Sequence, residues 1–421
     1  MYRIILKIAV LIFVVVFSSF SFAQDKIAVI NVDSTEITMV SGVRISRHMG
    51  NIHLFNADRN MHIYCDTAEN YRGENLYLLK SNVKIEDDEK ILMSEKIRYN
   101  TLSEKAVSPG PFIFEQLETG MILTGNTGTY DMKTENLVAR ENVVYKDSTR
   151  TLFCDIGKYD VNTDKFVARE NVIYEDSIRT FYSDIAEYDK ISGEVSAFEN
   201  IRFYDLESNV FAVADTGKFF QNEEYGIMSG NPIAAIADSA SDDSLYISGN
   251  IIEFFKEDSA KVIISDNVNI QKGNMTAYSQ RAVYDKLNSF VYLREKPEII
   301  QDSLYISGDL IDLKLEDQKL TEVIVRENAS ALYNADSTGF SDLKNKLTGK
   351  TITIFIKDNV IDRVEADMSA EMIYHSFDEN NKFLSTYLMT SGIIELLFKD
   401  GQIINIKGFP EVNTYSIIKK N

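Results

Sequence analysis

The sequence predicts an all-β protein, a repetitive and solenoid-like stack of units about 30 residues long. Residues 140–168 and 169–197 align without a gap and are identical at 14 of 29 positions. Within each copy, β-branched and aromatic residues alternate with charged ones, which is the pattern of half-buried strands. After residue 23 no stretch has sustained helical apolar spacing. A fixed period of this length is typical of stacked architectures, in which each unit covers the apolar face of its neighbour.

The repeat can be followed along the chain by an opening Asn or Pro that precedes an apolar pair. Each opener is predicted to begin a strand, and the proline versions allow a register error of one residue, because proline cannot donate to a ladder. A small residue followed by an acid, as in Cys65-Asp66 and Ser183-Asp184, forms a second hallmark. The openers recur at intervals of 29 to 35 residues: Asn51, Asn82, Pro111, Asn142, Asn171, Asn200, Pro232, Asn267, Pro297 and Asn328.

Turn-forming residues separate the predicted strands. Asp147-Ser148 and the Asn-Thr-Asp segment 162–164 interrupt the alternation within the duplicated units. Asp400-Gly401 is the best two-residue hairpin signal in the chain. Each stretch between these signals has the length of a strand, so strand and turn alternate throughout.

The first 23 residues have the features of a cleaved secretory signal peptide. Arg3 and Lys7 supply a cationic start, the segment 8–17 is apolar but short for a membrane span, and small residues precede Gln24. The alternative is an uncleaved membrane anchor. If this segment is a cleaved signal peptide, the rest of the chain is expected to be exported to the periplasm.

The remaining chain is expected to contain two repeat regions. Beyond Leu304 the units lengthen to near 41 residues, while the alternation of strand and turn continues. We therefore divide the chain into a signal peptide (1–23), an N-terminal repeat region (24–303) and a C-terminal repeat region with longer units (304–421). No proline-rich or low-complexity linker separates them, which favours an array over independent globular domains.

Charge and cysteine content limit the partners and the chemistry. The formal net charge is -20, and about -22 without Arg3 and Lys7, so nucleic acid is an unfavourable partner. Cys65 and Cys154 occupy equivalent positions three units apart. That separation is at least ~14 Å if units are spaced by one strand or more, which is too far for a disulfide. We expect both cysteines to be small core residues.

The repeated motifs resemble one known family. Asn-Val and Asn-Ile openers, strands close to the pattern Ala/Ser/Cys-Asp-x-Ala-x-Tyr and the Gly-Asp-x-Ile-x-Leu segment at 308–313 lie between Gly50 and Tyr415. In this respect the chain is similar to the OstA/LptA family of lipopolysaccharide-transport proteins, in particular the longer OstA-like branch of Bacteroidetes-type bacteria. The resemblance implies a β-jellyroll of two facing antiparallel sheets, open at both ends, with lipid acyl chains lying along the apolar interior.

The same resemblance implies a non-enzymatic role without cofactors. The implied cargo is lipopolysaccharide or a related glycolipid. The implied partners are inner-membrane and outer-membrane transport components, which would dock on terminal strand edges, and end-to-end self-association is a further option. Residues that alternate inward after each opener are the candidate lipid-groove lining: Val83, Ile85, Phe112, Phe114, Val143, Tyr145, Val172, Tyr174, Ile201, Phe203, Val268 and Ile270.

Two other interpretations of the repeats remain open. In a structural or adhesive β-solenoid at the cell surface, the same residues would form a solid core without lipid. In a carbohydrate-active β-helix enzyme, one unit would carry an exceptional cluster of acids, whereas acids recur here in every unit. Slipping the strand register by one residue would exchange the inward and outward residues.

No catalytic or metal-binding constellation stands out. His48, His53, His62 and His375 do not have ligand spacing and are expected on strand faces or the surface. The repeated acids Asp155, Asp184 and Asp215 lack the Gly-Gly-x-Gly-x-Asp pattern of calcium-binding repeats, so turn formation or edge protection is the favoured role. No nucleophile elbow or nucleotide-binding loop is present.

Overall fold

The structure, a computed structural model, describes residues 27–40, 42–148, 150–175, 179–206, 210–220, 225–236, 244–255, 261–316, 319–335, 343–358, 360–378, 382–399 and 402–418. The chain forms two compact units, unit 1 (1–168) and unit 2 (169–421). The predicted signal peptide and the Asp400-Gly401 hairpin lie outside the described residues. Within the described ranges, no helix has the length and apolar character needed to cross a membrane.

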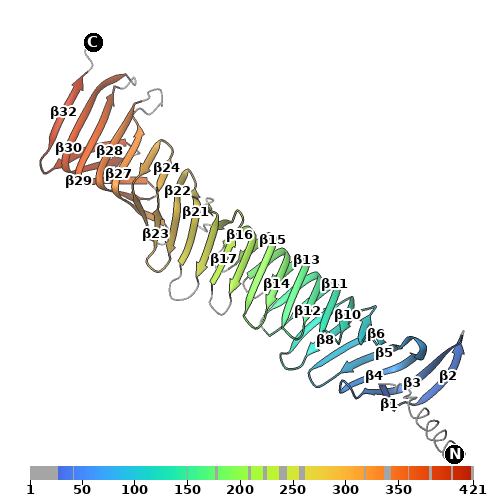
Figure 1. The fold of residues 1–421 in the computed structure, drawn as a ribbon. Helices are drawn as coiled ribbons and strands as arrows, with labels where there is room; N and C mark the ends of the chain where they lie inside the picture. The colour runs from blue at the N-terminus through green and yellow to red at the C-terminus, as the bar shows by residue number, and fades with distance from the viewer. Residues whose placement is uncertain are drawn as a thin grey trace, which may run out of the picture. The chain divides into compact units, whose positions relative to one another are not determined.

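Unit 1 consists of antiparallel strands that follow one another in chain order (Figure 1). A 3-10 turn, η1 (Arg72–Glu74), separates two of them. The strands are β1 (Ile27–Asn31), β2 (Ser34–Val40), β3 (Val43–Asn56), β4 (Met61–Tyr71), β5 (Leu76–Glu86), β6 (Lys90–Asn100), β7 (Lys105–Ser108), β8 (Phe112–Gln116), β9 (Met121–Gly125), β10 (Thr127–Asp131), β11 (Asn136–Lys146) and β12 (Thr151–Asp160).

Unit 2 has the same organisation, and its strands β27 to β30 are longer, with 14 to 18 residues each. The strand β13 (Lys165–Glu175) contains the last residues of unit 1 and the first of unit 2. The following strands are β14 (Arg179–Asp189), β15 (Glu194–Asp205), β16 (Val210–Phe220), β17 (Tyr225–Ser229), β18 (Ile233–Ile236), β19 (Leu245–Ser248), β20 (Ile251–Phe255), β21 (Lys261–Lys272), β22 (Met275–Asp285), β23 (Phe290–Arg294), β24 (Glu298–Gln301), β25 (Leu304–Ser307), β26 (Leu310–Glu316), β27 (Lys319–Asn334), β28 (Lys344–Lys357), β29 (Val360–Phe377), β30 (Phe383–Lys399), β31 (Gln402–Phe409) and β32 (Asn413–Ile418).

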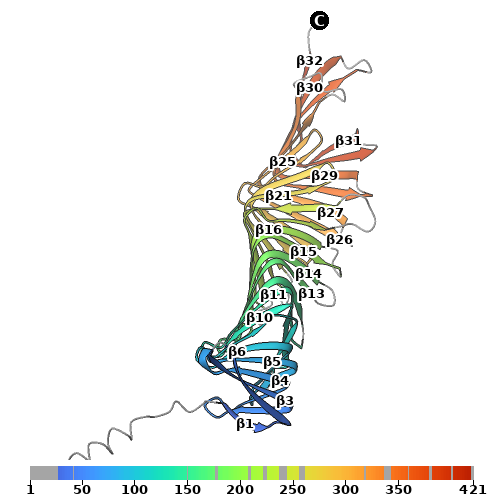
Figure 2. The ribbon, with the colours of Figure 1, turned by 90° about the vertical axis from the view of Figure 1, so that its right-hand side faces the viewer.

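Long strands bend at a corner, and the two arms of one strand belong to different sheets. In β11 the corner is the pair Glu141-Asn142, both with positive φ, where the pairing register with β12 shifts. The arm before the corner pairs with β10, whereas the arm after it pairs with β9. We call the sheet that contains arms such as 143–146 sheet A and the sheet that contains arms such as 136–140 sheet B. Figure 2 shows the bent strands from the side.

The asparagine openers therefore do not begin strands, and for them that prediction is wrong, whereas Pro111, Pro232 and Pro297 stand immediately before β8, β18 and β24. Asn82, Asn142 and Asn200 lie inside strands, at the corner, with φ between 51° and 54°. Asparagine tolerates this left-handed conformation better than most residues, which explains its recurrence. The register allowance for a proline opener is confirmed, because Asn231 takes the corner conformation and Pro232 follows it.

The corner also explains the repeated acids. Asn82 Nδ2 donates to Asp66 Oδ2 over 2.8 Å, and Asn200 Nδ2 donates to Asp184 Oδ2 over 2.6 Å. Asn231 donates in the same way to Asp215, over 3.4 Å. The opener of one strand thus binds the acid of the preceding strand, so both sequence hallmarks belong to one ladder of corner hydrogen bonds.

Side chains from sheets A and B meet in the interior of unit 1. The ring centroids of Tyr145 in sheet A and Phe166 in sheet B lie 4.7 Å apart, and those of Phe114 and Tyr130 lie 5.2 Å apart. The predicted turns at Asp147-Ser148 and 162–164 also separate strands. The prediction of an all-β fold with antiparallel strands in two facing sheets is confirmed.

Candidate functional site: the apolar interior between the sheets

All twelve predicted lining residues lie in sheet A and follow the corner with the predicted alternation. Ten of them are buried, with at most 5% of their surface exposed. Tyr174 and Phe203 are half-buried. The inward parity of the strands thus agrees with the sequence pattern, while their use as a lipid groove stays a prediction. The buried ten are Val83, Ile85, Phe112, Phe114, Val143, Tyr145, Val172, Ile201, Val268 and Ile270.

Sequence reasoning missed the opposite wall of the interior, which sheet B supplies. Tyr99, Tyr130 and Tyr159 are buried there, and each lies five residues before the last residue of a turn. These last turn residues are Glu104, Glu135 and Asp164, respectively. The tyrosine of the Ala/Ser/Cys-Asp-x-Ala-x-Tyr pattern could have revealed this wall, because an aromatic recurs at the same place in successive repeats from Tyr99 to Tyr188.

Large side chains fill the interior of unit 1. Phe114 and Leu123 are fully buried, and Tyr145 and Phe166 are 1% exposed. The ring centroid of Tyr159 lies 6.2 Å from that of Tyr145 and 6.4 Å from that of Phe114. To lie among these described side chains, a hydrocarbon chain would have to displace them or the two sheets would have to part.

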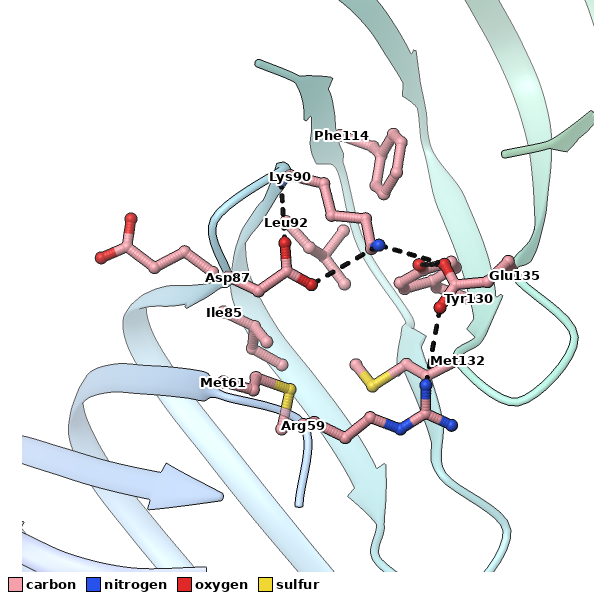
Figure 3. Close-up of a pocket in the computed structure, with 11 residues that line it drawn as sticks. Arg59, Met61, Ile85, Asp87, Lys90, Leu92, Phe114, Tyr130, Met132 and Glu135 are labelled. Atoms are coloured by element: carbon pink, nitrogen blue, oxygen red, sulfur yellow. Dashed lines mark hydrogen bonds and ion pairs between the residues drawn. The ribbon is translucent and has the colours of Figure 1, made fainter. Parts of the chain in front are cut away.

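Polar bridges join the two sheets of unit 1 along the edge opposite the corners, which we call the open edge. Arg59, in a sheet A turn, places Nη2 2.6 Å from Glu104 Oε2 and Nη1 3.6 Å from Glu135 Oε1, both in sheet B turns. Lys90, at the start of β6 in sheet A, places Nζ 3.3 Å from Glu135 Oε2. Figure 3 shows Arg59 and Lys90 approaching Glu135 from the other sheet.

Lys90 is well enclosed for a lysine at the start of a strand, with 12% of its side chain exposed. Burial alone would lower the pKa of Lys90, but the carboxylates of Asp87 and Glu135 outweigh burial and raise that pKa above its ordinary value. Burial raises the pKa of Tyr130, and a hydrogen bond that its hydroxyl donates to Glu135 raises it further. At neutral pH the cluster thus combines a charged lysine and a neutral tyrosine at the carboxyl group of Glu135.

A small cavity of about 30 Å³ lies beneath these charges. Met61, Ile85, Leu92 and Phe114 line it, each with at most 4% of its surface exposed (Figure 3). The volume corresponds to about one water molecule, so the cavity is a packing gap and not a lipid site. Its position shows that the ion cluster directly covers the apolar interior.

The first half of unit 2 has a different interior. Ala197, Ala212 and Ala214 are buried, and around them Phe181 and Phe203 are only half-buried. Both Phe side chains lie on the inward side of sheet A, since Phe181 pairs with Phe203 and both pack against the buried alanines. Small residues thus replace large ones, and inward aromatic rings remain accessible to solvent.

The turns of sheet B differ in the same region. Glu104, Glu135 and Asp164 each end a turn with φ between 52° and 56°. At the equivalent position of the next repeat stands Gly193, with φ 71°. Glycine takes this conformation without steric cost, but it brings no carboxylate to the open edge.

The histidines take strand-face positions, with one contact that spacing did not predict. His53 and His62 face each other across β3 and β4, with Nε2 of His53 2.9 Å from Nδ1 of His62. His48 is 8% exposed and contacts Thr35. His375 contacts Thr386 across β29 and β30. In the part of the chain that the structure describes, no three His, Cys, Asp or Glu side chains are grouped to hold a metal ion.

The cysteines are core residues, as predicted. Cys65 and Cys154 are free thiols, each 4% exposed. Burial raises the pKa of Cys65 to about 11, with smaller effects from its neighbours. The protonated thiol is a weak nucleophile, so reactive-cysteine chemistry has no support at this position.

Comparisons with known proteins can be set beside this geometry. Residues 21–155 match the OstA-like protein family, which confirms the predicted resemblance over that range. No curated protein matches the chain. The structure of LptH, the LptA-homologous periplasmic component of the lipopolysaccharide transport device of Pseudomonas aeruginosa, is similar at 15% identity and a TM-score of 0.27, over 35% of this chain and 95% of that chain. The extracellular domain of BT4673 from B. thetaiotaomicron is similar at 8% identity and a TM-score of 0.11, over 93% and 99% of the two chains.

Proposed function

We propose, from the OstA-like character of residues 21–155, that this chain is a non-enzymatic lipid conduit of the periplasm. Its cargo would be the acyl chains of lipopolysaccharide or a related glycolipid on the way to the outer membrane. The observation that carries the proposal is an apolar interior that continues between two facing sheets through the OstA-like segment and recurs in unit 2. The signal peptide predicted at residues 1–23 would export the chain.

The physical advantage of such an interior is large. An acyl chain that crosses an aqueous compartment exposes its methylenes at a cost of ~0.8 kcal/mol each. Two sheets that bury their apolar faces against each other can bury acyl chains between them at little further cost, provided that the sheets part. The half-buried rings of Phe181 and Phe203 supply apolar surface that is already accessible.

Terminal strands support the proposed partners. Every residue of β2 is exposed, including Ile37, Met39 and Val40 at more than half of their surface, and β2 pairs with β3. Tyr415 and Ile417 of β32 are also more than 60% exposed, and β32 pairs with β30. Exposed apolar strands of this kind invite β-strand addition by a partner. We propose that inner-membrane and outer-membrane transport components, or further copies of the chain, dock there, and that the longer units of 304–421 belong to the same conduit.

One observation favours a second candidate, the structural β-solenoid without cargo. The interior of unit 1 is filled by its own side chains, as a solid core would be. The two candidates differ in what happens at the inward positions when lipid is present: a conduit gives lipid access to them, and a solid core does not.

Photocrosslinking in living cells separates these candidates. A crosslinkable residue is placed in turn at the inward positions Tyr145 and Tyr174 and at their outward neighbours Val144 and Ile173. The conduit predicts adducts with lipopolysaccharide at the inward positions alone. If the exported, folded protein captures no lipid at any position, the conduit is wrong and the solid solenoid is the better account.

A further inference from the structure

We propose that Arg59, Lys90, Glu104 and Glu135 form a latch that holds the open edge of unit 1 shut, and that acyl chains reach this interior only after the latch opens. The inference rests on the proposed conduit function. Each of its ion pairs joins a turn of sheet A to a turn of sheet B, over distances between 2.6 and 3.6 Å.

The strand connectivity determines where the sheets can part. At the corners the backbone runs from one sheet into the other, for example through Glu141-Asn142 in β11. Covalent continuity and corner hydrogen bonds such as Asn82–Asp66 resist separation on that side. At the open edge the sheets are joined by side chains, so widening the interior means breaking side-chain contacts there and not backbone pairing.

Glu135 is the centre of the latch. Its carboxylate contacts Arg59, Lys90 and the hydroxyl of Tyr130. With 18% of its side chain exposed, Glu135 is screened by solvent much less than an ordinary surface acid. Losing this carboxylate would leave Lys90 paired with Asp87 and Glu89 of its own sheet, and would leave the pair with Glu104 to hold Arg59 to sheet B. The loss therefore favours separation of the turns.

Further along the same edge, another bridge between the sheets is a hydrogen bond between uncharged side chains. Tyr159 of sheet B donates a hydrogen bond to Gln116 Oε1 of sheet A over 2.7 Å. The hydroxyl of Tyr159 also contacts Asp164, the turn acid equivalent to Glu135. The repeat thus supplies a turn acid and a tyrosine to the open edge of unit 1 more than once, which a chance surface ion pair would not do.

The test compares latch variants with a matched control in the purified full-length mature chain. Glu135→Gln and Lys90→Met each remove one charge of the latch and keep most of the side-chain volume. Lys105→Met removes an ion pair of similar geometry, Lys105 to Asp131 at 3.0 Å, that lies within sheet B. A photocrosslinker at position 145 reports the arrival of lipopolysaccharide, added as the probe.

Both latch variants are expected to form adducts at position 145 about fivefold faster than the parent chain, a change equivalent to ~1 kcal/mol. The Lys105→Met control is expected to match the parent. Equal rates in all four proteins, with adducts forming in the parent, would overturn the latch. Using two latch variants keeps the comparison informative if one of them misfolds.

Hydrogen exchange tests the latch without cargo. Amide exchange at Leu92 and Met132, which flank the cluster, is expected to be faster in both latch variants and unchanged in Lys105→Met. If no protein captures lipid, the conduit function fails, and the exchange data still decide whether the latch exists. Unchanged exchange in both latch variants refutes it.

Discussion

Unit 1 and the described residues between 179 and 255 of unit 2 share one repeat, yet their interiors differ. In unit 1, rings such as Phe114 and Tyr145 fill the space between the sheets, and charged bridges close the open edge. In unit 2, Ala197 and Ala212 line the corresponding space beside half-buried phenylalanines. The difference teaches that one backbone plan can hold a tightly packed interior or an accessible one, depending on side-chain size and on the turn residue at the open edge.

The largest expected effect comes from deleting an interior ring in each region. Phe114→Ala should destabilise unit 1 by about 3–5 kcal/mol, because a fully buried ring leaves a cavity between two sheets. Phe203→Ala should cost only about 1–2 kcal/mol, because its ring is already half-exposed. Hydrogen exchange in urea, measured within the unit that carries the change, gives both values. Equal losses would contradict the contrast in packing.

Enlarging a small inward residue tests the contrast from the other direction. Ala139→Leu, at a position with no exposed surface in unit 1, should cost about 1–3 kcal/mol through overpacking. Ala234→Leu, at a half-buried position in unit 2, should cost less than about 1 kcal/mol for the same added volume.

Hydrogen exchange in urea also measures the local unfolding free energy of the Ala139→Leu and Ala234→Leu variants. Lipid photocrosslinking at Phe203 would add a second readout, since Leu at 234 should obstruct the accessible interior. A larger stability loss at 234 than at 139 would show that the unit 2 interior is closed in solution.

The corner should behave alike in both regions. Asn82→Ala and Asn200→Ala each remove a side-chain hydrogen bond to an acid and force alanine into the left-handed region, so each should cost about 1–2 kcal/mol. Asn82→Gly should cost less, because glycine accepts the backbone conformation. Urea midpoints of the two alanine variants that differ widely would show that the corner is not an equivalent element of the two units.

The smallest effect is the pH dependence of single carboxylates. Burial opposes the charged form of Glu69, but hydrogen bonds from Lys80, Tyr71 and Arg47 hold its pKa below the ordinary value of 4.5. The pKa of Glu69 is therefore lower in the folded state than in the unfolded state. The contribution of Glu69 to stability is complete above the unfolded-state pKa and is lost as the pH falls through the lowered folded-state pKa.

Glu194 of unit 2 gives the comparison. The pKa of Glu194 is also lowered, chiefly by hydrogen bonds from Lys218 and Ser196, but 32% of its side chain is exposed, against 8% for Glu69. We expect Glu69→Gln to reduce stability at pH 6 more than Glu194→Gln, with both differences becoming smaller as the pH falls. Urea unfolding at pH 6 and pH 3 measures this, and a difference that is as large at pH 3 as at pH 6 would contradict a carboxylate origin.

The sequence by itself determined the all-β class, the turns and the inward parity of residues such as Val83 and Tyr145. These features follow from period-two alternation and turn chemistry, which act between residues close in the chain. The sequence did not reveal that Asn142 bends a strand instead of preceding its start. A bend within a strand and the start of a strand leave the following residues with the same alternation between the two faces of the sheet, so the pattern does not distinguish them.

Only the tertiary structure decided which distant residues meet. Arg59 contacts Glu104 across a sequence separation of 45 residues, and Phe114 meets Tyr159 from the other sheet. The sequence contains these residues, but their contact depends on two sheets facing each other at a fixed separation. That separation results from the corners and from packing of the whole unit, which no local pattern of residues specifies.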